Sequence, residues 1–366
     1  MYKVLHTLPA LDGGGAEKIV FDYSVRMMDN FTFDFITHSE KEGILEKKLK
    51  ELGCNIFHVP PLHKDKTKYK RMIYNIIKNG HYDIIHVSQG YKGLYFLYYA
   101  KILGVKVRIV HSHMAFIPES LKERSIRKIS TFLCKKYANC FFACSEAAGK
   151  WMWGGFDRNS SSYYIMKNGI NAIDYAFSQQ DRIDIRSEYG FKDSDLVIGT
   201  FARFSYQKTH DFLIQTFYFI KKRIKNAKLL LLGNGELEES IKQSVRDYQM
   251  EDCVVFGGVR DDAFRVYNAL DLFLLPSRFE GLGIVFIEAQ ANGLRCITSN
   301  RVPKESNILG LVSYLSLDRS PEDWANFICS LNVKRKKVKI SNFQYDICNC
   351  VTELSRYYME QLKKGD

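Results

Sequence analysis

Short apolar runs alternate with longer amphipathic stretches along the whole chain. The runs are rich in Val, Ile, Leu and Phe and are bounded by polar or glycine-containing segments, which is typical of strands buried on both faces. The stretches between them repeat apolar residues at helical spacing. The predicted strands are 4–7, 33–37, 56–59, 84–87, 107–110, 140–143, 163–166, 197–201, 229–232, 254–256, 272–275 and 295–298.

This alternation predicts an α/β fold with two doubly wound parallel sheets, each covered by helices on both faces. A length of 366 residues also favours two domains. The boundary is expected at Asn168-Gly169, where a turn signal follows the strand 163–166. The predicted domains are residues 1–170 and 171–345, followed by a helix within 346–366.

The composition excludes several classes of protein. With 46% hydrophobic residues the chain can bury sizeable cores, so it is neither disordered, collagen-like nor a coiled coil. Its nine cysteines are scattered without a CxxC pair, which favours a reducing cytosol over a disulfide or zinc framework. There is no signal-peptide pattern and no apolar run long enough to span a membrane, so we expect a protein that is soluble or lies on a membrane.

The net charge of +12 is unevenly distributed. Residues 1–170 hold 26 Lys and Arg against 15 Asp and Glu, and the remaining residues are nearly neutral. An amphipathic helix is predicted over 118–137, with Arg124, Arg127, Lys128 and Lys135 on one side. Nucleic-acid binding would need an RNP, helix-turn-helix or zinc pattern, and none is present. An anionic membrane surface is the more specific expectation for this basic half, although a merely solvated surface would look the same.

Residues 277–289 join the strand 272–275 to a helical pattern and are the most informative segment. Gly281 and Gly283 would leave backbone N–H groups open at the helix start, where the helix dipole favours a phosphate. Glu280 precedes the helix and Glu288 lies two turns into it, so we expect different partners, a sugar for Glu280 and ribose hydroxyls for Glu288. An ordinary glycine loop followed by a helix would show the same pattern.

This segment resembles the paired-glutamate signature of the family 4 retaining glycosyltransferases, and the resemblance covers essentially the whole chain. It implies the GT-B fold, in which two Rossmann-like, doubly wound domains face a cleft and a C-terminal helix crosses back to the first domain. Arg203 and Lys208, after the strand 197–201, match the segment that neutralises the donor diphosphate in that family. A guanidinium fork and an ammonium group both suit phosphate oxygens.

The resemblance also implies a set of site residues. The expected donor-binding residues are Gly14, Gly15, Gly199, Arg203, Lys208, Gly233, Gly235, Gly258, Val259, Ser277, Glu280, Gly281, Leu282, Gly283, Ile284 and Glu288. The expected catalytic residues are Glu280, Arg203, Lys208 and His113, the last matching a histidine placed over the donor sugar. His111 points to the same side by strand periodicity, so which of the two faces the sugar is open.

No metal or cofactor is expected. Asp193-Ser194-Asp195 is formally a DxD metal motif, but it precedes a strand and consists of ordinary turn residues. Arg203, Lys208 and the helix start already supply the positive charge that a metal would bring.

The implied function is transfer of a sugar from a nucleotide diphosphate, favouring a UDP-sugar, with retention of anomeric configuration. The expected acceptor is lipid-linked or a growing saccharide in capsule or exopolysaccharide synthesis. The expected place is the cytoplasm, with peripheral attachment to the inner face of the cell membrane. Two alternatives stay open, a nucleotide-sugar epimerase and a non-catalytic sugar- or membrane-binding protein.

Overall fold

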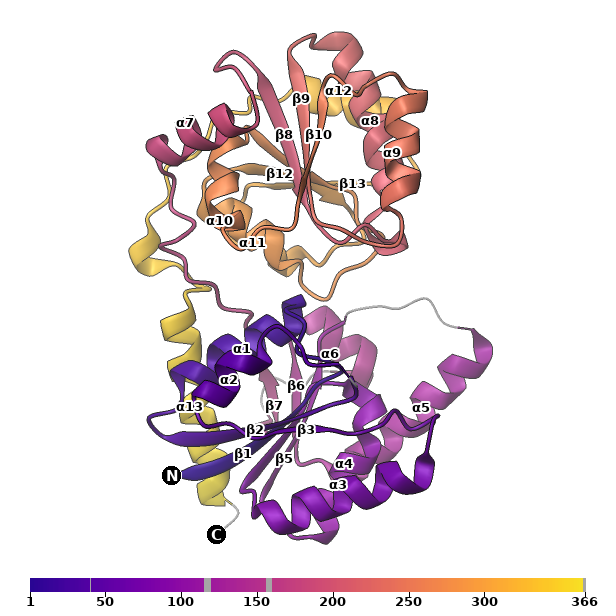
Figure 1. Cartoon of the computed structure of the whole chain (residues 1–366), viewed down its shortest axis with the longest axis vertical. Helices are drawn as coiled ribbons and strands as arrows, with labels where there is room; N and C mark the ends of the chain where they lie inside the picture. The colour runs from indigo at the N-terminus through magenta and orange to yellow at the C-terminus, as the bar shows by residue number, and fades with distance from the viewer. Residues whose placement is uncertain (40, 115–119, 156–159, 365–366) are drawn as a thin grey trace. The chain divides into compact units, whose positions relative to one another are not determined.

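The computed structural model describes residues 1–39, 41–114, 120–155 and 160–364, and divides into two compact units. Unit 1 comprises Met1–Gly169 together with Ile347–Asp366, and unit 2 comprises Ile170–Asp346. Each unit is built on its own parallel sheet (Figure 1).

Unit 1 has a seven-stranded sheet in the order β3-β2-β1-β4-β5-β6-β7. Its strands are β1 (Tyr2–Thr7), β2 (Phe31–Thr37), β3 (Ile56–His58), β4 (Ile84–Val87), β5 (Val107–Ser112), β6 (Cys140–Ala143) and β7 (Tyr163–Ile165). Its helices are α1 (Gly15–Arg26), α2 (Glu46–Glu51), α3 (Lys66–Gly80), α4 (Leu94–Ile102), α5 (Leu121–Tyr137), α6 (Glu146–Trp153) and α13 (Ile347–Lys364). Figure 1 shows α1 and α13 on one face of this sheet and α3 and α4 on the other.

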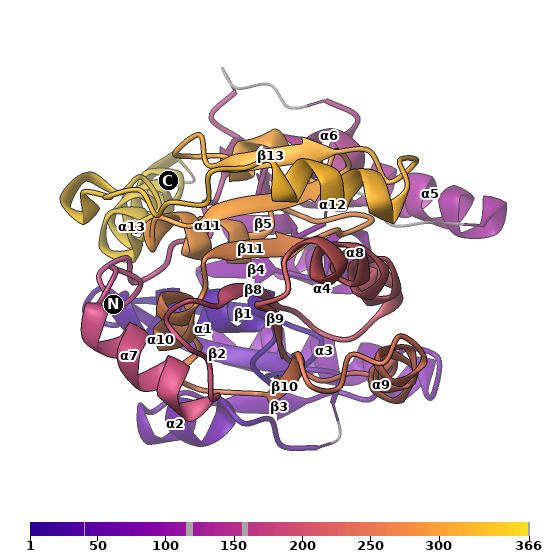
Figure 2. The ribbon, with the colours of Figure 1, turned by 90° about the horizontal axis from the view of Figure 1, so that it is seen from above.

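Unit 2 has a six-stranded sheet in the order β10-β9-β8-β11-β12-β13. Its strands are β8 (Leu196–Phe201), β9 (Ala227–Leu232), β10 (Val254–Gly258), β11 (Leu272–Leu275), β12 (Arg295–Ser299) and β13 (Val312–Leu315). Its helices are α7 (Gln179–Glu188), α8 (His210–Arg223), α9 (Glu238–Asp247), α10 (Ala263–Val266), α11 (Ile284–Ala291) and α12 (Pro321–Cys329). Figure 2 shows α8, α9 and α12 on one side of this sheet and α7, α10 and α11 on the other.

The central strands are apolar along their whole length because helices cover both of their faces. Every residue of β11 and every residue of β4 is buried. Two-sided burial removes the alternation of apolar and polar residues that an exposed sheet would show. All twelve predicted strands are therefore present, and the prediction of two doubly wound parallel sheets is confirmed.

The final helix completes the core of unit 1. Tyr358 of α13 is fully buried, its hydroxyl lies 2.6 Å from Nδ1 of His86, and its ring meets Phe31 edge-on at 5.6 Å. The two ends of unit 2 lie side by side, because the N–H of Ile170 donates to the carbonyl of Tyr345 over 2.8 Å. Unit 2 is therefore inserted into unit 1 through two adjacent crossings.

Both sheets reverse their strand order beside the first strand of the unit, between β1 and β4 and between β8 and β11. The loops that leave the carboxyl ends of these strands diverge there, and doubly wound sheets bind ligands at that point. The loops after β8 and β11 in unit 2, and those after β1, β4 and β5 in unit 1, are therefore where a site is expected.

Candidate functional site

In unit 2 the loops after β8 and β11 are joined by hydrogen bonds. The N–H of Arg278 donates to the carbonyl of Gln207 over 2.8 Å, and Nε2 of Gln207 donates to the carbonyl of Phe279 over 2.8 Å. The hydroxyl of Thr209 donates to the carbonyl of Pro276. These bonds hold the two loops in one fixed arrangement at the point where the strand order reverses.

Lys208 and Glu280 meet across these loops. Nζ of Lys208 lies 2.5 Å from Oε1 of Glu280, and the hydroxyl of Ser277 donates to the same oxygen over 2.6 Å. Glu280 is only 6% exposed, whereas a lone carboxylate would rarely be buried. The predicted site residues Lys208, Ser277 and Glu280 are thus brought into direct contact, although 72 positions separate the lysine from the glutamate.

The helix α11 begins immediately after this pair. Its N-cap, Gly283, has a φ of 83°, a left-handed conformation that favours glycine. A Cβ there would also lie 2.7 Å from the ring of Phe286. The predicted glycine-marked helix start is present, with the first turn of α11 following Gly283.

Glu288 lies further along α11, beside two tyrosines. The Tyr175 hydroxyl donates to Oε1 over 2.9 Å and the Tyr267 hydroxyl to Oε2 over 2.7 Å. Burial, together with the nearby carboxylate, raises the pKa of Tyr267, so its hydroxyl stays protonated and can donate. The two tyrosines hold the Glu288 carboxylate in place, and its predicted contact to ribose stays a prediction.

Arg203 follows β8 and pairs with Glu236, which follows β9. Its Nη2 lies 3.1 Å from Oε2 of Glu236, and both side chains are largely exposed. Gly233, between β9 and Glu236, lies against the same loop, because a Cβ there would stand 2.1 Å from the carbonyl oxygen of Ala202. A Cβ at Gly235 would lie 2.4 Å from the carbonyl oxygen of Phe204. The structure therefore explains these two glycines by contact between loops of unit 2.

Gly199 is buried inside β8, and a Cβ there would lie 2.5 Å from the Leu270 side chain. The glycine therefore leaves room for Leu270 in the core, and its contact with a donor stays a prediction. Gly258 and Val259, in contrast, are exposed at the carboxyl end of β10, and the Gly258 carbonyl accepts from the N–H of Gly233.

In unit 1 the glycine loop after β1 leads into α1. Gly14 is the N-cap, and its N–H donates to Oε2 of Glu17 over 3.1 Å. Gly15 is exposed, and a Cβ at that position would have no neighbour within 4 Å. The backbone at Gly15 is therefore uncrowded, whereas the N–H of Gly14 is already paired with Glu17. The predicted approach of these two glycines to a donor phosphate stays a prediction.

Histidines from three neighbouring strands form a buried row in unit 1. His6 of β1 lies 4.8 Å from His86 of β4, measured between ring centroids. Nε2 of His86 is hydrogen-bonded to Nδ1 of His111 at 3.0 Å, and the rings of His111 and His113 lie 3.8 Å apart. Burial lowers the pKa of His6 to about 3 and that of His113 to about 4, and it lowers the pKa values of His86 and His111 as well.

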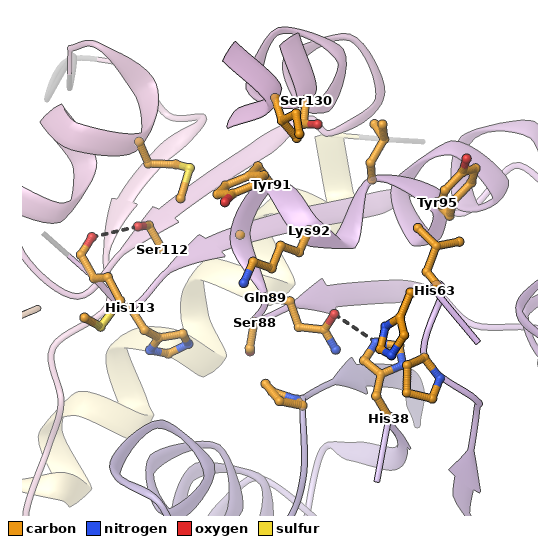
Figure 3. Close-up of a pocket in the computed structure, with 18 of the residues that line it drawn as sticks. His38, His63, Ser88, Gln89, Tyr91, Lys92, Tyr95, Ser112, His113 and Ser130 are labelled. Carbon is orange, nitrogen blue, oxygen red and sulfur yellow. Dashed lines mark hydrogen bonds between the residues drawn. The ribbon is translucent and has the colours of Figure 1, made fainter. Parts of the chain in front are cut away.

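His111 and His113 differ in what surrounds them. His111 is fully buried within the row, whereas His113 lines a pocket together with Ser112 and Met114 (Figure 3). Its Nε2 has no hydrogen-bond partner among the described residues. His113 is thus the one of the two whose ring borders open space, and its imidazole is neutral at pH 7.

Two of the basic residues predicted on α5 also contact α6. The guanidinium of Arg127 lies 4.7 Å from the centre of the Trp151 ring, and Nζ of Lys135 donates to the carbonyl of Trp153 over 2.6 Å. Arg124, Lys128 and Lys135 are exposed and Arg127 is half-buried. A role of these four residues at a membrane stays a prediction.

Several residues of both sites escaped the sequence analysis. Ser88 and Gln89 follow β4 at the reversal point of unit 1, so their place at a strand end was a usable signal. Gln207 lies between two residues of the predicted diphosphate segment. Tyr175 and Tyr267 come from segments distant from Glu288, and no spacing rule connects them with it.

Within the described residues, no cluster of three or more His, Cys, Asp or Glu side chains is arranged to hold a metal ion. Asp195 accepts from the N–H of Lys192 in the turn before β8. None of the helices in the described part of the chain is both long and apolar enough to cross a membrane.

Two family models match the chain. Residues 13–172 match the description "Glycosyltransferase Family 4", and residues 181–331 match "Glycosyl transferases group 1". A Bacillus subtilis (strain 168) protein named as a glycosyltransferase, EpsF, is 30% identical over 333 residues, covering 89% of this chain and 86% of EpsF. The UDP-Gal:α-D-GlcNAc-diphosphoundecaprenol α-1,3-galactosyltransferase of Escherichia coli is 25% identical over 75% of this chain and 73% of its own length.

Solved structures share the architecture. HepE of Anabaena, crystallised with UDP-glucose, superimposes with a TM-score of 0.79 at 18% identity, covering 98% of this chain and 100% of HepE. At that identity the similarity shows the fold alone. The two parallel sheets and this similarity assign the GT-B fold to the chain.

Proposed function

The chain belongs to glycosyltransferase family 4, and on that premise we propose that it is a retaining enzyme that transfers a hexose from a nucleotide diphosphate donor. The donor we favour is a UDP-sugar, and the acceptor is lipid-linked or a growing saccharide in capsule or exopolysaccharide synthesis. The observation that carries the proposal is the contact between Lys208 and Glu280 at the reversal point of unit 2. A cation and a carboxylate joined there suit a donor with a charged diphosphate and a hydroxyl-rich sugar.

In this proposal, unit 2 stabilises the charge that develops on the leaving diphosphate. Lys208 and Arg203 supply positive charge, and the start of α11 supplies backbone N–H groups and the positive end of a helix dipole. These groups stand in place before the reaction, and such preorganised electrostatics is usually the largest catalytic effect. We propose no metal or cofactor for this step, because these groups supply the positive charge.

Glu280 would hold hydroxyls of the donor sugar, and the acceptor hydroxyl would attack from the face that the diphosphate leaves. The departing phosphate would take the acceptor proton, so the anomeric configuration is retained without a dedicated base. His113 of unit 1 would orient the sugar. Because burial lowers its pKa to about 4, its imidazole is neutral at pH 7 and can both donate and accept hydrogen bonds.

Two relatives support the choice of substrates. The name of the E. coli relative gives UDP-galactose as donor and a diphosphoundecaprenol-linked sugar as acceptor. HepE was crystallised with UDP-glucose, which supports a uridine nucleotide in a protein of this fold. We extend the nucleotide and the class of acceptor to this chain, and we leave the individual sugars open.

We further propose that unit 1 works on the anionic inner surface of the cell membrane. Unit 1 carries nearly all of the net positive charge, and Arg124 and Lys128 are exposed on α5. Sedimentation with phosphatidylglycerol vesicles should show binding that weakens as salt is added and when Arg124 and Lys128 are both changed to Glu. Binding that is indifferent to salt, or absent, would contradict this part of the proposal.

The function is tested by incubating the purified chain with a panel of nucleotide sugars and a lipid extract, while following nucleotide diphosphate release and labelled lipid. Release that depends on the acceptor, with label entering lipid, is the expected result. A free, altered nucleotide sugar would indicate an epimerase instead. If no nucleotide diphosphate is released and no nucleotide sugar is altered, the result would indicate a non-catalytic binding protein.

A further inference from the structure

Unit 1 contains a cavity of about 830 Å³ at the carboxyl ends of its central strands. Residues that follow β1, β2, β4 and β5 line it, and α5 and α6 contribute further side chains. Figure 3 shows His113 and Ser112 on one side, His38 and His63 on the other, and Lys92 between them. The volume lies within the range of about 300–1,000 Å³ that is usual for sites of small ligands.

The wall combines apolar surface with positive charge. Its apolar and aromatic residues include Leu62, Leu94, Tyr91, Tyr95, Trp151 and Met152. Lys92 also lines the cavity, and Nζ of Lys70 lies 4.7 Å from the centre of the Tyr95 ring. Of the described residues that line it, none is Asp or Glu. A saccharide alone would present many hydroxyl donors to a wall without carboxylate acceptors, so the wall fits an anion with an apolar part better.

Polar atoms deep in the cavity are without partners. Ser88 is more than nine-tenths buried, and its Oγ has no hydrogen-bond partner among the described residues. Nε2 of the half-buried Gln89 also has no partner among the described residues, and the amide oxygen of Gln89 is paired with Nε2 of His38 over 3.0 Å. Buried polar groups normally have partners, so a hydroxyl and an amide N–H₂ left without one mark a place for acceptor oxygens such as those of a phosphate.

The apolar surface continues outside the cavity along α5. Ile126 lines the cavity and is 50% exposed, and the same helix exposes Leu121, Ile129 and Phe132 by 83%, 63% and 70%. A surface helix normally turns its apolar face toward the core, whereas the buried residues of α5 are Thr131 and Cys134. Exposed contiguous apolar surface of this kind marks an interaction site.

We infer that this cavity binds the phosphate end of a lipid-linked acceptor, with Lys92, Ser88 and Gln89 holding the phosphate or diphosphate. The first part of the lipid chain lies against Tyr91, Tyr95 and Trp151, and the rest leaves over Ile126 and the exposed face of α5. The inference rests on the proposed function and narrows its acceptor to a lipid phosphate, because a saccharide acceptor would leave the apolar face of α5 without a purpose.

The probe that tests this inference is farnesyl diphosphate, measured by calorimetry on the full chain, with inorganic diphosphate and N-acetylglucosamine as the two partial ligands. We expect farnesyl diphosphate to bind at least about tenfold more tightly than either. Leu62→Glu places a carboxylate in the cavity wall and should weaken farnesyl diphosphate binding by about tenfold or more. Leu52→Glu is its matched control, because Leu52 is 43% exposed against 39% for Leu62 and does not line the cavity.

Lys92→Gln serves as a second variant, and it should weaken farnesyl diphosphate and inorganic diphosphate alike. Equal binding of farnesyl diphosphate by the Leu62 and Leu52 variants would overturn the inference, and so would inorganic diphosphate binding as tightly as the farnesyl compound. The experiment contains no nucleotide sugar. A negative binding result therefore contradicts the inference without affecting the transfer assay. If the transfer assay fails while farnesyl diphosphate still binds, the proposed function alone is contradicted.

Discussion

In unit 2 the loops at the reversal point are tied together by charged side chains, whereas in unit 1 the corresponding loops surround neutral histidines and an open cavity. Lys208, Ser277 and Glu280 already satisfy one another in unit 2. In unit 1, Ser88, Gln89 and His113 each keep a polar atom without a partner in the described residues. The two sheets share the order of their first six strands, yet one supports a site whose charged groups are already paired and the other a site with polar atoms left for a ligand.

The largest effect on activity is expected from Lys208→Ala in unit 2. Transfer should fall by about a hundredfold to a thousandfold, the usual cost of removing one preorganised charge-stabilising group. The measurement is kcat/KM for the nucleotide sugar, with the melting temperature recorded in parallel. Lys242→Ala removes a half-exposed lysine of unit 2 that pairs with Glu238, and it should change neither value much. Full transfer by the Lys208 variant would contradict the site.

Acid should weaken unit 1 before unit 2. Eight of the nine histidines lie in unit 1, and the folded pKa values of His6 and His113 are lowered to about 3 and about 4. Below pH 6.5 these two histidines bind protons in the unfolded chain but stay neutral in the folded one, so the free energy of unfolding falls as the pH falls. At pH 5 the loss is about 2 kcal/mol for each of the two.

Tryptophan fluorescence follows mainly unit 1, which holds Trp151 and Trp153 while unit 2 holds Trp324, and far-UV circular dichroism follows both units. Between pH 7.5 and pH 5 the fluorescence midpoint of thermal unfolding should drop further than the dichroism midpoint. His6→Leu should remove part of that drop. Parallel shifts of both midpoints, with no effect of the variant, would refute the assignment to unit 1.

Gly233→Ala tests the tight loop packing of unit 2. The new Cβ would lie 2.1 Å from the carbonyl oxygen of Ala202 at a φ of 133°, so we expect a loss of about 2 kcal/mol or more in the free energy of unfolding. Gly190→Ala is the control within the same unit, because its φ is also positive but nothing lies within 4 Å of the new atom. Equal losses in urea denaturation would show that the Ala202 contact is unimportant.

The smallest effect on stability is expected at the open glycine loop of unit 1. Gly15→Ala meets no neighbour within 4 Å and should raise the free energy of unfolding by about 0.4–1 kcal/mol. The same methyl group should raise KM for the nucleotide sugar if the loop approaches the donor phosphate. An unchanged KM would remove Gly15 from the donor site.

The sequence predicted the strands well because burial on both faces makes them continuous apolar runs. It missed β13, where Ser313 and Tyr314 interrupt the run at the edge of the sheet and only the first and last residues are buried. It also placed Glu280, Ser277 and Lys208 correctly on loops, because the polar residues that follow buried strands in a doubly wound sheet lie at the carboxyl edge of that sheet. That these three residues touch depends on the loop bonds made by Gln207, which no local pattern records.

Helix α5 shows the reverse case. Its amphipathic pattern was visible in the sequence, but spacing alone does not say which side packs inward. Arg127 stacks on Trp151, and Nζ of Lys135 donates to the end of α6. The buried residues of the helix are Thr131 and Cys134, whereas Ile129 and Phe132 are exposed. Which side of the helix packs inward depends on the neighbouring helix, and the spacing of residues within α5 carries no information about that neighbour.

The insertion of unit 2 has a consequence for synthesis on the ribosome. Residues 170–346 form one continuous segment, so unit 2 can fold as soon as it has emerged. Unit 1 is translated first, yet its core is incomplete until α13 has been made, because Tyr358 of that helix packs against His86 and Phe31. The half of the protein that is translated first is therefore the half that finishes last, and a chain that stops before residue 347 would leave unit 2 complete and unit 1 without its last helix.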